Sequence, residues 1–339
     1  MSQGGQSRKR ATVHDVARTA GVSRGTVSRF LNGERYVSAA ARSAIEQAIA
    51  EVGYSPNTAA QNLVRQRTQA VALIVHEPHH LFLEDPNIGA ITLGANAALS
   101  EADYQLVFLI VDSARDTSRV ARYLAGGFVD GAIVVSARVD DPITRAIERV
   151  QVPAVFVGHP PGLTAPWVGI DNRGSTRELI ERLMATGRSR IGMIAAALDR
   201  DSGADRLAGF TDALGDRFDP VLVEETPLYT FRGGADAMRA LLERAPDLDG
   251  VFAASDSLAA GAMQALQDMG RRVPEDIGVV GFDDSAWAHR TSPALSTVHQ
   301  PARGLGEAAA AAVLAAIAGE DGPTSGVLLD TPVVWRDSA

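Results

Sequence analysis

From Ala70 onward the sequence alternates short apolar runs of strand length with longer segments whose apolar residues recur every three or four positions. This βα alternation is typical of a parallel sheet with helices on both faces. The alternation passes through four strand-like runs and then restarts, so it predicts two doubly wound subdomains. The expected strands are 71–75, 105–111, 131–135, 154–157, 168–170, 191–195, 221–225, 251–254 and 277–281. The expected helices are 91–102, 117–124, 142–149, 176–186, 206–214, 235–244 and 258–269. A helix at 304–318 and short strands near 327–329 and 333–335 are expected where the chain crosses back between the subdomains.

The first 55 residues follow a different, all-helical pattern. Apolar residues at helical spacing follow Thr12 and stop at Gly21, and Ser23 begins a second short helix after a turn of only a few residues. After a loop, Ser38 begins a third helix that Gly53 ends. A helix-turn-helix domain has this order of elements: a helix, a tight turn containing glycine, a second helix, a loop and a third helix.

Charge is distributed unevenly along the chain. The net charge is −9, but residues 1–67 hold ten Lys and Arg against four Asp and Glu, whereas the remainder holds 22 against 37. A basic module attached to an acidic body is typical of a DNA-binding domain joined to a domain that does not bind DNA. A solvated basic tail is the alternative that composition leaves open.

Length and composition exclude several classes of protein. A chain of 339 residues is expected to form two or three compact units. It has no cysteine, which excludes disulfides and thiolate metal sites and suits a reducing cytoplasm. No apolar run reaches the length of a membrane span, and the start is polar and basic without the apolar region of a signal peptide. We therefore expect a cytoplasmic protein with no membrane partner.

The second helix carries the side chains expected to read DNA. Arginine at the N-terminal end of a recognition helix binds guanine with two hydrogen bonds, which makes Arg24 and Arg29 the base-reading candidates. The hydroxyls of Thr26 and Ser28 are better suited to phosphate oxygens, which position the module without specifying sequence. An arginine on a surface helix is more often simply solvated, and this alternative stays open.

The run T-V-H-D-V-A-R-T-A-G-V-S-R-G-T-V-S-R-F-L-N-G, continued by V-G-Y-S-P-N-T-A-A-Q-N-L, resembles the signature of the lac-repressor family, also called the LacI/GalR type, of transcription regulators. The resemblance extends through V-D-G-A-I-V-V, V-F-A-A-S-D-S-L-A-A-G-A, R-V-P-E-D-I-G-V-V-G-F-D-D and L-S-T-V-H-Q-P, and covers roughly residues 11–336. It implies an N-terminal all-α helix-turn-helix domain and an α/β periplasmic-binding-protein-like domain of two doubly wound parallel-sheet subdomains.

The resemblance also implies a division of the chain. The expected parts are a disordered basic tail at 1–10, the helix-turn-helix domain at 11–55, a hinge helix or linker at 56–67, and an effector-binding and dimerisation domain at 68–339. We expect the effector-binding domain to have two subdomains. The first is about 68–168 with 302–323, and the second is 169–298 with 326–339. Leu63 in the hinge would insert into the minor groove and bend the DNA. The expected DNA-binding residues are Thr12, Ser23, Arg24, Gly25, Thr26, Ser28, Arg29, Asn32, Tyr36, Asn57, Ala60 and Leu63.

Six residues resemble the effector-pocket positions of the family. They are Ser202, Arg206, Tyr229, Asp256, Asp283 and Gln300. An arginine fork and carboxylates suit a polyhydroxyl ligand, and an aromatic ring covers the apolar face of a sugar. The alternative for Asp256 is a helix cap after a strand. A purine effector is the alternative ligand.

The chain departs from the family pattern at two positions. Gly25 stands where the family commonly has alanine, and glycine within a helix costs about 0.5–1 kcal/mol relative to alanine. Ser255 stands where asparagine is usual, so a hydroxyl replaces an amide that could both donate and accept.

Competing functions find less support in the sequence. A dehydrogenase would place G-x-G-x-x-G after the first strand, and no such motif is present there. The only G-x-S-x-G, Gly21 to Gly25, lies between two head helices. A periplasmic sugar-binding protein would share the two-lobed fold but not the basic head. The segment around His76, His79 and His80 fits no common zinc spacing. No enzymatic activity, cofactor or metal is therefore expected.

We expect a repressor that binds a near-palindromic operator as a homodimer, with a tetramer as the alternative. A small molecule, expected to be a saccharide, would change operator affinity by linkage.

Overall fold

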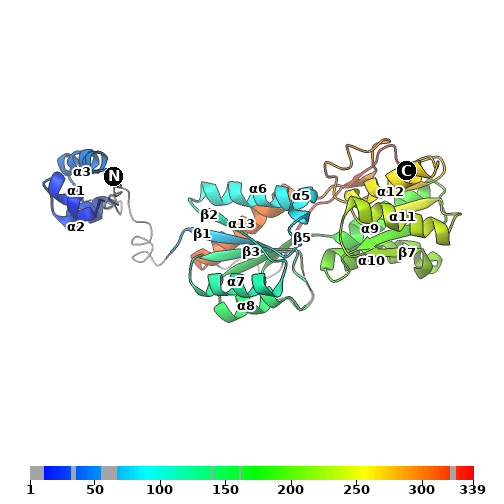
Figure 1. Ribbon diagram of the computed structural model, residues 1–339, viewed down its shortest axis with the longest axis horizontal. Coiled ribbons are helices and arrows are strands. Elements are labelled where there is room, and N and C mark those ends of the chain that lie inside the picture. Colours follow the sequence, from blue (N-terminus) through cyan, green and yellow to red (C-terminus); the bar gives the residue numbers. More distant parts are fainter. Residues whose placement is uncertain are drawn as a thin grey trace, which may run out of the picture. The chain divides into compact units, whose positions relative to one another are not determined.

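The computed structural model describes residues 11–31, 36–54, 67–138, 140–159, 162, 164–320 and 326–339. Contacts divide the chain into two compact units, residues 1–67 and 68–339, which we call the head and the body. Figure 1 shows the helices of the head and the sheets of the body. No helix in the described ranges is long and apolar enough to cross a membrane.

The head is a bundle of three helices, α1 (Val13–Thr19), α2 (Arg24–Leu31) and α3 (Ala39–Val52). Gly21 makes the turn between α1 and α2 with φ +66°, a left-handed conformation that glycine adopts without a steric cost. One apolar stripe from each helix faces the others, as the 3.6-residue period requires. The buried core consists of Val16, Ala17, Val27, Ile45 and Ala48.

The first lobe of the body is built on a six-stranded parallel sheet in the order β11-β5-β4-β3-β1-β2. Alternate residues of β1 (Ala70–Val75), which lies between β3 and β2, pack toward opposite faces. Helices α6 and α13 cover one face and α7 and α8 cover the other (Figure 1). The remaining elements are β2 (Gln105–Ile110), β3 (Gly131–Val135), β4 (Ala154–Val157), β5 (Trp167–Ile170), β11 (Val327–Leu329), α5 (Leu81–Glu84), α6 (Pro86–Glu101), α7 (Ala114–Ala125), α8 (Pro142–Val150) and α13 (Ala302–Ala318).

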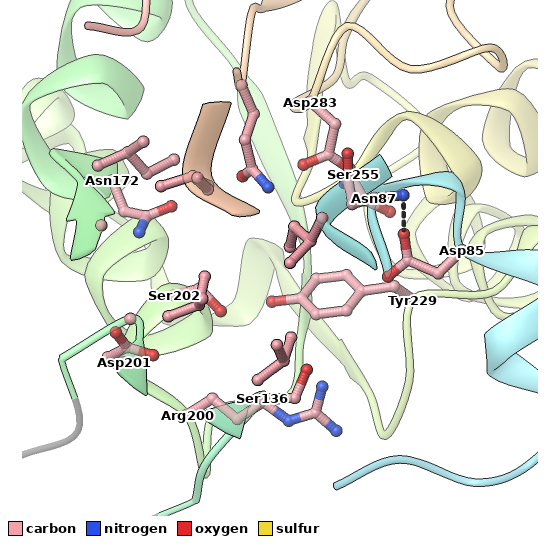
Figure 2. Close-up of a pocket in the computed structure, with 18 of the residues that line it drawn as sticks. Asp85, Asn87, Ser136, Asn172, Arg200, Asp201, Ser202, Tyr229, Ser255 and Asp283 are labelled. Atoms are coloured by element: carbon pink, nitrogen blue, oxygen red, sulfur yellow. Dashed lines mark hydrogen bonds between the residues drawn. The ribbon is translucent and has the colours of Figure 1, made fainter. Parts of the chain in front are cut away.

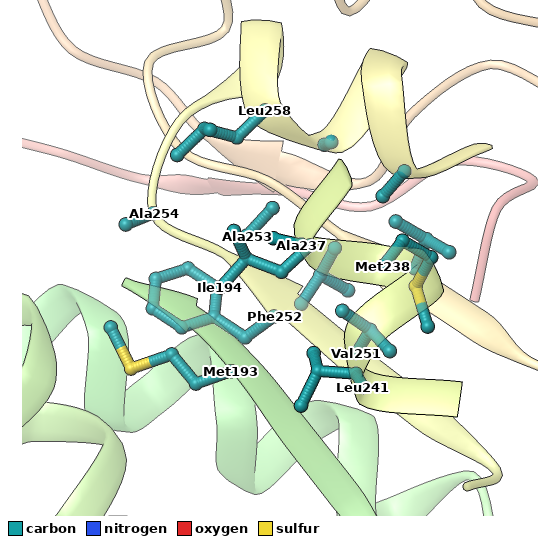
Figure 3. Packing of buried hydrophobic residues seen from close by; sticks show 14 of the residues in the cluster. Met193, Ile194, Ala237, Met238, Leu241, Val251, Phe252, Ala253, Ala254 and Leu258 are labelled. Atoms are coloured by element: carbon teal, nitrogen blue, oxygen red, sulfur yellow. The ribbon is translucent and has the colours of Figure 1, made fainter. Parts of the chain in front are cut away.

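The second lobe is built on a four-stranded parallel sheet in the order β7-β6-β8-β9. Its core joins the sheet to α11 and α12 through residues such as Phe252, Met238 and Leu258 (Figure 3). Two short antiparallel strands, β10 and β12, complete this lobe. The elements are α9 (Asn172–Ala185), β6 (Ile191–Ala196), α10 (Asp201–Leu214), η1 (Gly215–Arg217), η2 (Pro220–Leu222), β7 (Val223–Thr226), α11 (Phe231–Arg244), β8 (Gly250–Ala253), α12 (Asp256–Asp268), β9 (Gly278–Val280), β10 (Thr297–Val298) and β12 (Val333–Val334).

Strand β11 and the second half of β5 belong to a different lobe from the one the sequence predicted. The expected boundary assigned residues 169–298 and 326–339 to the second lobe, but β5 pairs with β4 and β11 pairs with β5 in the first sheet. Sequence periodicity identifies a strand, whereas its partner is determined by hydrogen bonds to residues far away in the chain. The chain consequently passes between the lobes three times, after β5, after β10 and after β11.

Candidate functional site: an inter-lobe cavity and a helix-turn-helix head

A cavity of about 280 Å³ lies between the two lobes of the body. This volume is near the lower end for small-molecule pockets, about 300–1,000 Å³. The first lobe contributes loops at the carboxyl ends of β1, β3, β4 and β5 and the start of α6. The second lobe contributes the starts of α9, α10 and α12 and the loop after β9. Strand ends and helix starts thus converge on the cavity, as in other open α/β sheets that bind ligands.

Arg206 is the most highly connected side chain of the cavity. Its guanidinium is buried and donates to the carbonyl oxygen of Ala254 (2.6 Å), to Oδ1 of Asn172 (2.9 Å) and to Oε1 of Gln300 (3.2 Å). It lies over the Phe282 ring, with the guanidinium carbon 3.7 Å from the ring centroid. These contacts hold a planar set of donors in one orientation, which is what recognition of adjacent hydroxyls requires.

Asp283 and Tyr229 flank this guanidinium. An Asp283 oxygen lies 3.5 Å from Arg206, and the Tyr229 ring centroid lies 5.9 Å from the guanidinium carbon. Burial raises the pKa of Asp283 well above its usual range, and Arg206 opposes this rise. Burial also raises the pKa of Tyr229, which Arg206 and the nearby Ser202 hydroxyl lower, and the buried Tyr229 hydroxyl makes no hydrogen bond of full geometry with any described residue. In Figure 2 this hydroxyl points toward Ser202 across the cavity. A ligand hydroxyl would satisfy it.

The structure brings five of the six expected effector residues to the cavity wall: Ser202, Arg206, Tyr229, Asp283 and Gln300. Asp256 does not line the cavity. It is completely buried at the start of α12, where its carboxylate accepts hydrogen bonds from the Thr297 hydroxyl (2.6 Å) and the Ser285 N–H (2.7 Å). Burial raises its pKa to about 7. These bonds tie the start of α12 to strand β10 and to the loop after β9.

Several polar residues of the cavity were missed by the sequence analysis. Asp85 caps α6 by accepting the N–H of Asn87 (2.9 Å, Figure 2), and burial raises the pKa of Asp85 to about 6. Asn172 begins α9 and holds Arg206. Each of these residues lies where a strand or loop gives way to a helix, a position at which polar residues are common. This pattern in the sequence could have identified both residues.

Three consecutive residues before and at the start of α10 contact the first lobe. Arg200 forms a buried bidentate ion pair with Glu77, which follows β1. Asp199 pairs with Arg138, which follows β3, at 2.6 Å. Asp201 accepts the N–H of His159, which follows β4. The segment 199–201 therefore joins the two lobes beside the cavity.

The histidines after β1 have other partners. His76 pairs with Asp141 at 2.6 Å and His79 with Asp112 at 2.8 Å. Among the residues that the structure describes, no group of three or more metal-binding side chains could hold a metal ion.

Three of the expected DNA-binding residues of the head take part in capping the helices: Thr12, Ser23 and Thr26. Thr12 caps α1 in a reciprocal arrangement with Asp15, and Ser23 lies within 2.8 Å of the Thr26 hydroxyl at the start of α2. The Arg29 Nε donates to the Gly25 carbonyl at 3.3 Å.

The other described DNA-binding candidates of the head are all exposed: Arg24, Gly25, Ser28, Arg29 and Tyr36. A β-carbon at Gly25 would contact only Ser23 Oγ, at 3.8 Å, so packing within the head does not require glycine there. Asn32, Asn57, Ala60 and Leu63 lie outside the described residues.

Comparison with known families identifies both units. Residues 12–57 match the model described as "Bacterial regulatory proteins, lacI family", and residues 180–339 match "Periplasmic binding protein-like domain". The HTH-type transcriptional regulator CelR of Thermobifida fusca is 41% identical over 339 residues, which cover 98% of this chain and 99% of CelR.

Solved structures agree with this assignment. A transcriptional regulator CelR–cellobiose complex is 40% identical with a TM-score of 0.78, and the match covers 97% of this chain and 100% of that one. The lac repressor dimer bound to operator and an anti-inducer is 26% identical with a TM-score of 0.87, covering 97% and 99% of the two chains.

Proposed function

The chain belongs to the lacI family of bacterial regulatory proteins, and we propose that it is a repressor whose effector is a glucose disaccharide of the cellobiose type. The observation that carries this proposal is the 41% identity to CelR over nearly the whole of both chains, together with the CelR complex that holds cellobiose. The cavity has chemistry that matches such a ligand.

The five cavity residues Ser202, Arg206, Tyr229, Asp283 and Gln300 would bind the sugar hydroxyls. The guanidinium of Arg206 donates hydrogen bonds and the Asp283 carboxylate accepts them, so together they suit a pair of adjacent hydroxyls. The unpartnered Tyr229 hydroxyl is available for a third. Charge-assisted bonds of this kind discriminate strongly against ligands that lack the hydroxyl, because the buried polar groups are then left unpaired.

In the head, Arg24 is the principal base-reading residue of the proposal, because it is exposed at the first position of α2. Arg29 is the second, and it would exchange its bond to the Gly25 carbonyl for a base. Ser28 and Tyr36 would contact the DNA backbone. Thr12, Ser23 and Thr26 orient the starts of the helices, and Asn32, Asn57, Ala60 and Leu63 complete the proposed DNA surface with residues 56–67 as the hinge.

The proposed assembly is a homodimer that presents two heads to a near-palindromic operator. A ligand between the lobes binds one arrangement of the lobes more tightly than the other. This difference in ligand affinity shifts the equilibrium between operator-bound and free protein. We infer that cellobiose acts as an inducer and lowers operator affinity.

The test combines DNA selection with ligand titration on the full-length protein. A duplex enriched from a random library is labelled, and its binding is followed by fluorescence anisotropy at constant salt, with cellobiose, ribose or hypoxanthine added in parallel. Cellobiose alone should weaken binding to the selected duplex, and the matched variant Arg206→Met should bind the duplex but not respond. A response to hypoxanthine alone would contradict the proposed effector, and failure to enrich any sequence would contradict the proposed DNA reading.

A further inference from the structure

Helix α10 presents two adjacent rows of side chains to the inter-lobe cavity. Asp201, Ser202, Asp205 and Arg206 all line it. Residues four apart lie one above the other on a helix, so Ser202 and Arg206 form one row and Asp201 and Asp205 form the next. We call these the inner row and the outer row.

The inner row belongs to the buried part of the cavity. Arg206 is 5% exposed and holds Asn172 and Gln300, and Ser202 lies opposite the Tyr229 hydroxyl (Figure 2). This part can enclose one sugar ring with the residues already described.

The outer row faces a different set of neighbours. Partial desolvation at the mouth of the cavity, followed by repulsion from Asp201, raises the pKa of Asp205, and Asp171 adds to the rise, whereas Arg173 and His159 lower it. These electrostatic partners place Asp205 among groups that are separate from the Arg206 cluster. Asp205, Asp171 and His159 are exposed, so this part is the open end of the cavity.

An aromatic surface stands at the same open end. The rings of His159, after β4, and Trp167, in β5, are stacked with centroids 4.6 Å apart, and both residues line the cavity. The backbone N–H of His159 donates to the Asp201 carboxylate, which holds this segment beside the outer row. An aromatic surface next to carboxylates provides an apolar face and hydrogen-bond acceptors, which are the two kinds of contact that a pyranose ring makes.

We propose that the outer row of α10 and the His159–Trp167 stack form a second sugar-ring subsite, which makes the protein prefer a disaccharide to a monosaccharide. This inference rests on the proposed function. The inner row binds the first ring, and the glycosidic bond directs the second ring toward the open end. Asp205 accepts hydrogen bonds from hydroxyls of the second ring, and His159 packs against that ring.

The test is calorimetric titration of the full-length protein with glucose and with cellobiose. Asp205→Asn and His159→Ala change exposed side chains, so the folded structure is expected to persist, and thermal unfolding checks this. Each variant should bind cellobiose about tenfold more weakly, the loss that corresponds to about 1.4 kcal/mol, while its affinity for glucose equals that of the wild type. Asp236→Asn, which changes an exposed aspartate of α11 away from the cavity, is the matched control and should bind both sugars as the wild type does.

Two results would overturn the inference while leaving the proposed function intact. One is cellobiose binding that neither Asp205→Asn nor His159→Ala weakens, and the other is an equal loss of glucose and cellobiose affinity in both variants. Absence of cellobiose binding by the wild-type protein would instead overturn the proposed function, and the second subsite with it.

Discussion

Replacing Arg206 with methionine should destabilise the body as well as abolish effector binding. The guanidinium is buried, donates three hydrogen bonds and lies 3.5 Å from Asp283. Removing one partner of a buried pair costs about 3–5 kcal/mol, because the other charge is left uncompensated. Since these groups line a cavity into which water can move, we expect a loss of about 3 kcal/mol at neutral pH.

The loss should depend on pH in a defined direction. Burial already raises the pKa of Asp283, and removal of Arg206 should raise it further. An acid whose pKa is higher in the folded state stabilises the protein relatively more at low pH, and this contribution is lost as pH rises. The deficit of Arg206→Met should therefore be smaller at pH 5 than at pH 7.

Urea denaturation followed by tryptophan fluorescence measures these changes. All three tryptophans, Trp167, Trp287 and Trp335, lie in the body, so the signal does not report unfolding of the head. Protein concentration is held constant because association contributes to stability. A double-mutant cycle with Asp283→Asn should give a coupling of about 1–2 kcal/mol, as neighbouring charged groups do. Additive losses, or a deficit that grows in acid, would refute the reasoning.

Three further changes have defined outcomes. Arg24→Ala should reduce discrimination at one operator base pair by about 1–3 kcal/mol, measured with single-substitution duplexes; equal losses on operator and random DNA would assign Arg24 to phosphate. Gly306→Ala would place a β-carbon 2.0 Å from the Ile91 carbonyl oxygen, which would push α13 away from α6. The free energy of unfolding should therefore fall by about 1–3 kcal/mol in urea titrations, and an unchanged midpoint would contradict this. Burial raises the pKa of Asp256 to about 7, so the free energy of unfolding should fall as pH rises from about 4 to about 7 and level off above that; Asp256→Asn should flatten this slope, and an unaltered slope would assign it to other groups.

The sequence predicted the kinds of elements and the two-lobed architecture. The family comparisons and the sheet topology confirm the fold class. The helix at 142 begins where it was predicted, but several other helix starts were predicted too late because periodicity depends on apolar residues. The helix expected from residue 91 begins at Pro86, after the cap Asp85, and the helix expected from residue 176 begins at Asn172. Capping residues are polar and carry no periodic signal.

Prediction of the site was limited by contacts that are distant in sequence. Arg206 could be proposed from a resemblance, but its bond to Asn172 links residues 34 positions apart. The Glu77–Arg200 pair links residues 123 positions apart, and only the folded sheet brings the ends of β1 and the start of α10 together. Asp256 has the motif of a pocket residue, yet the bonds from Thr297 and Ser285 hold its carboxylate within the second lobe.

The interleaving of the two lobes has a consequence for biosynthesis. The outermost strand of the first sheet, β11, and the helix α13 that packs against α6 lie near the C-terminus of the chain. A nascent chain can therefore complete the second lobe up to β9 while the first lobe still exposes the apolar surface that α13 later covers. Premature termination before residue 302 would leave that surface uncovered, so truncated products should be directed to chaperones and proteases instead of accumulating as partly active receptors.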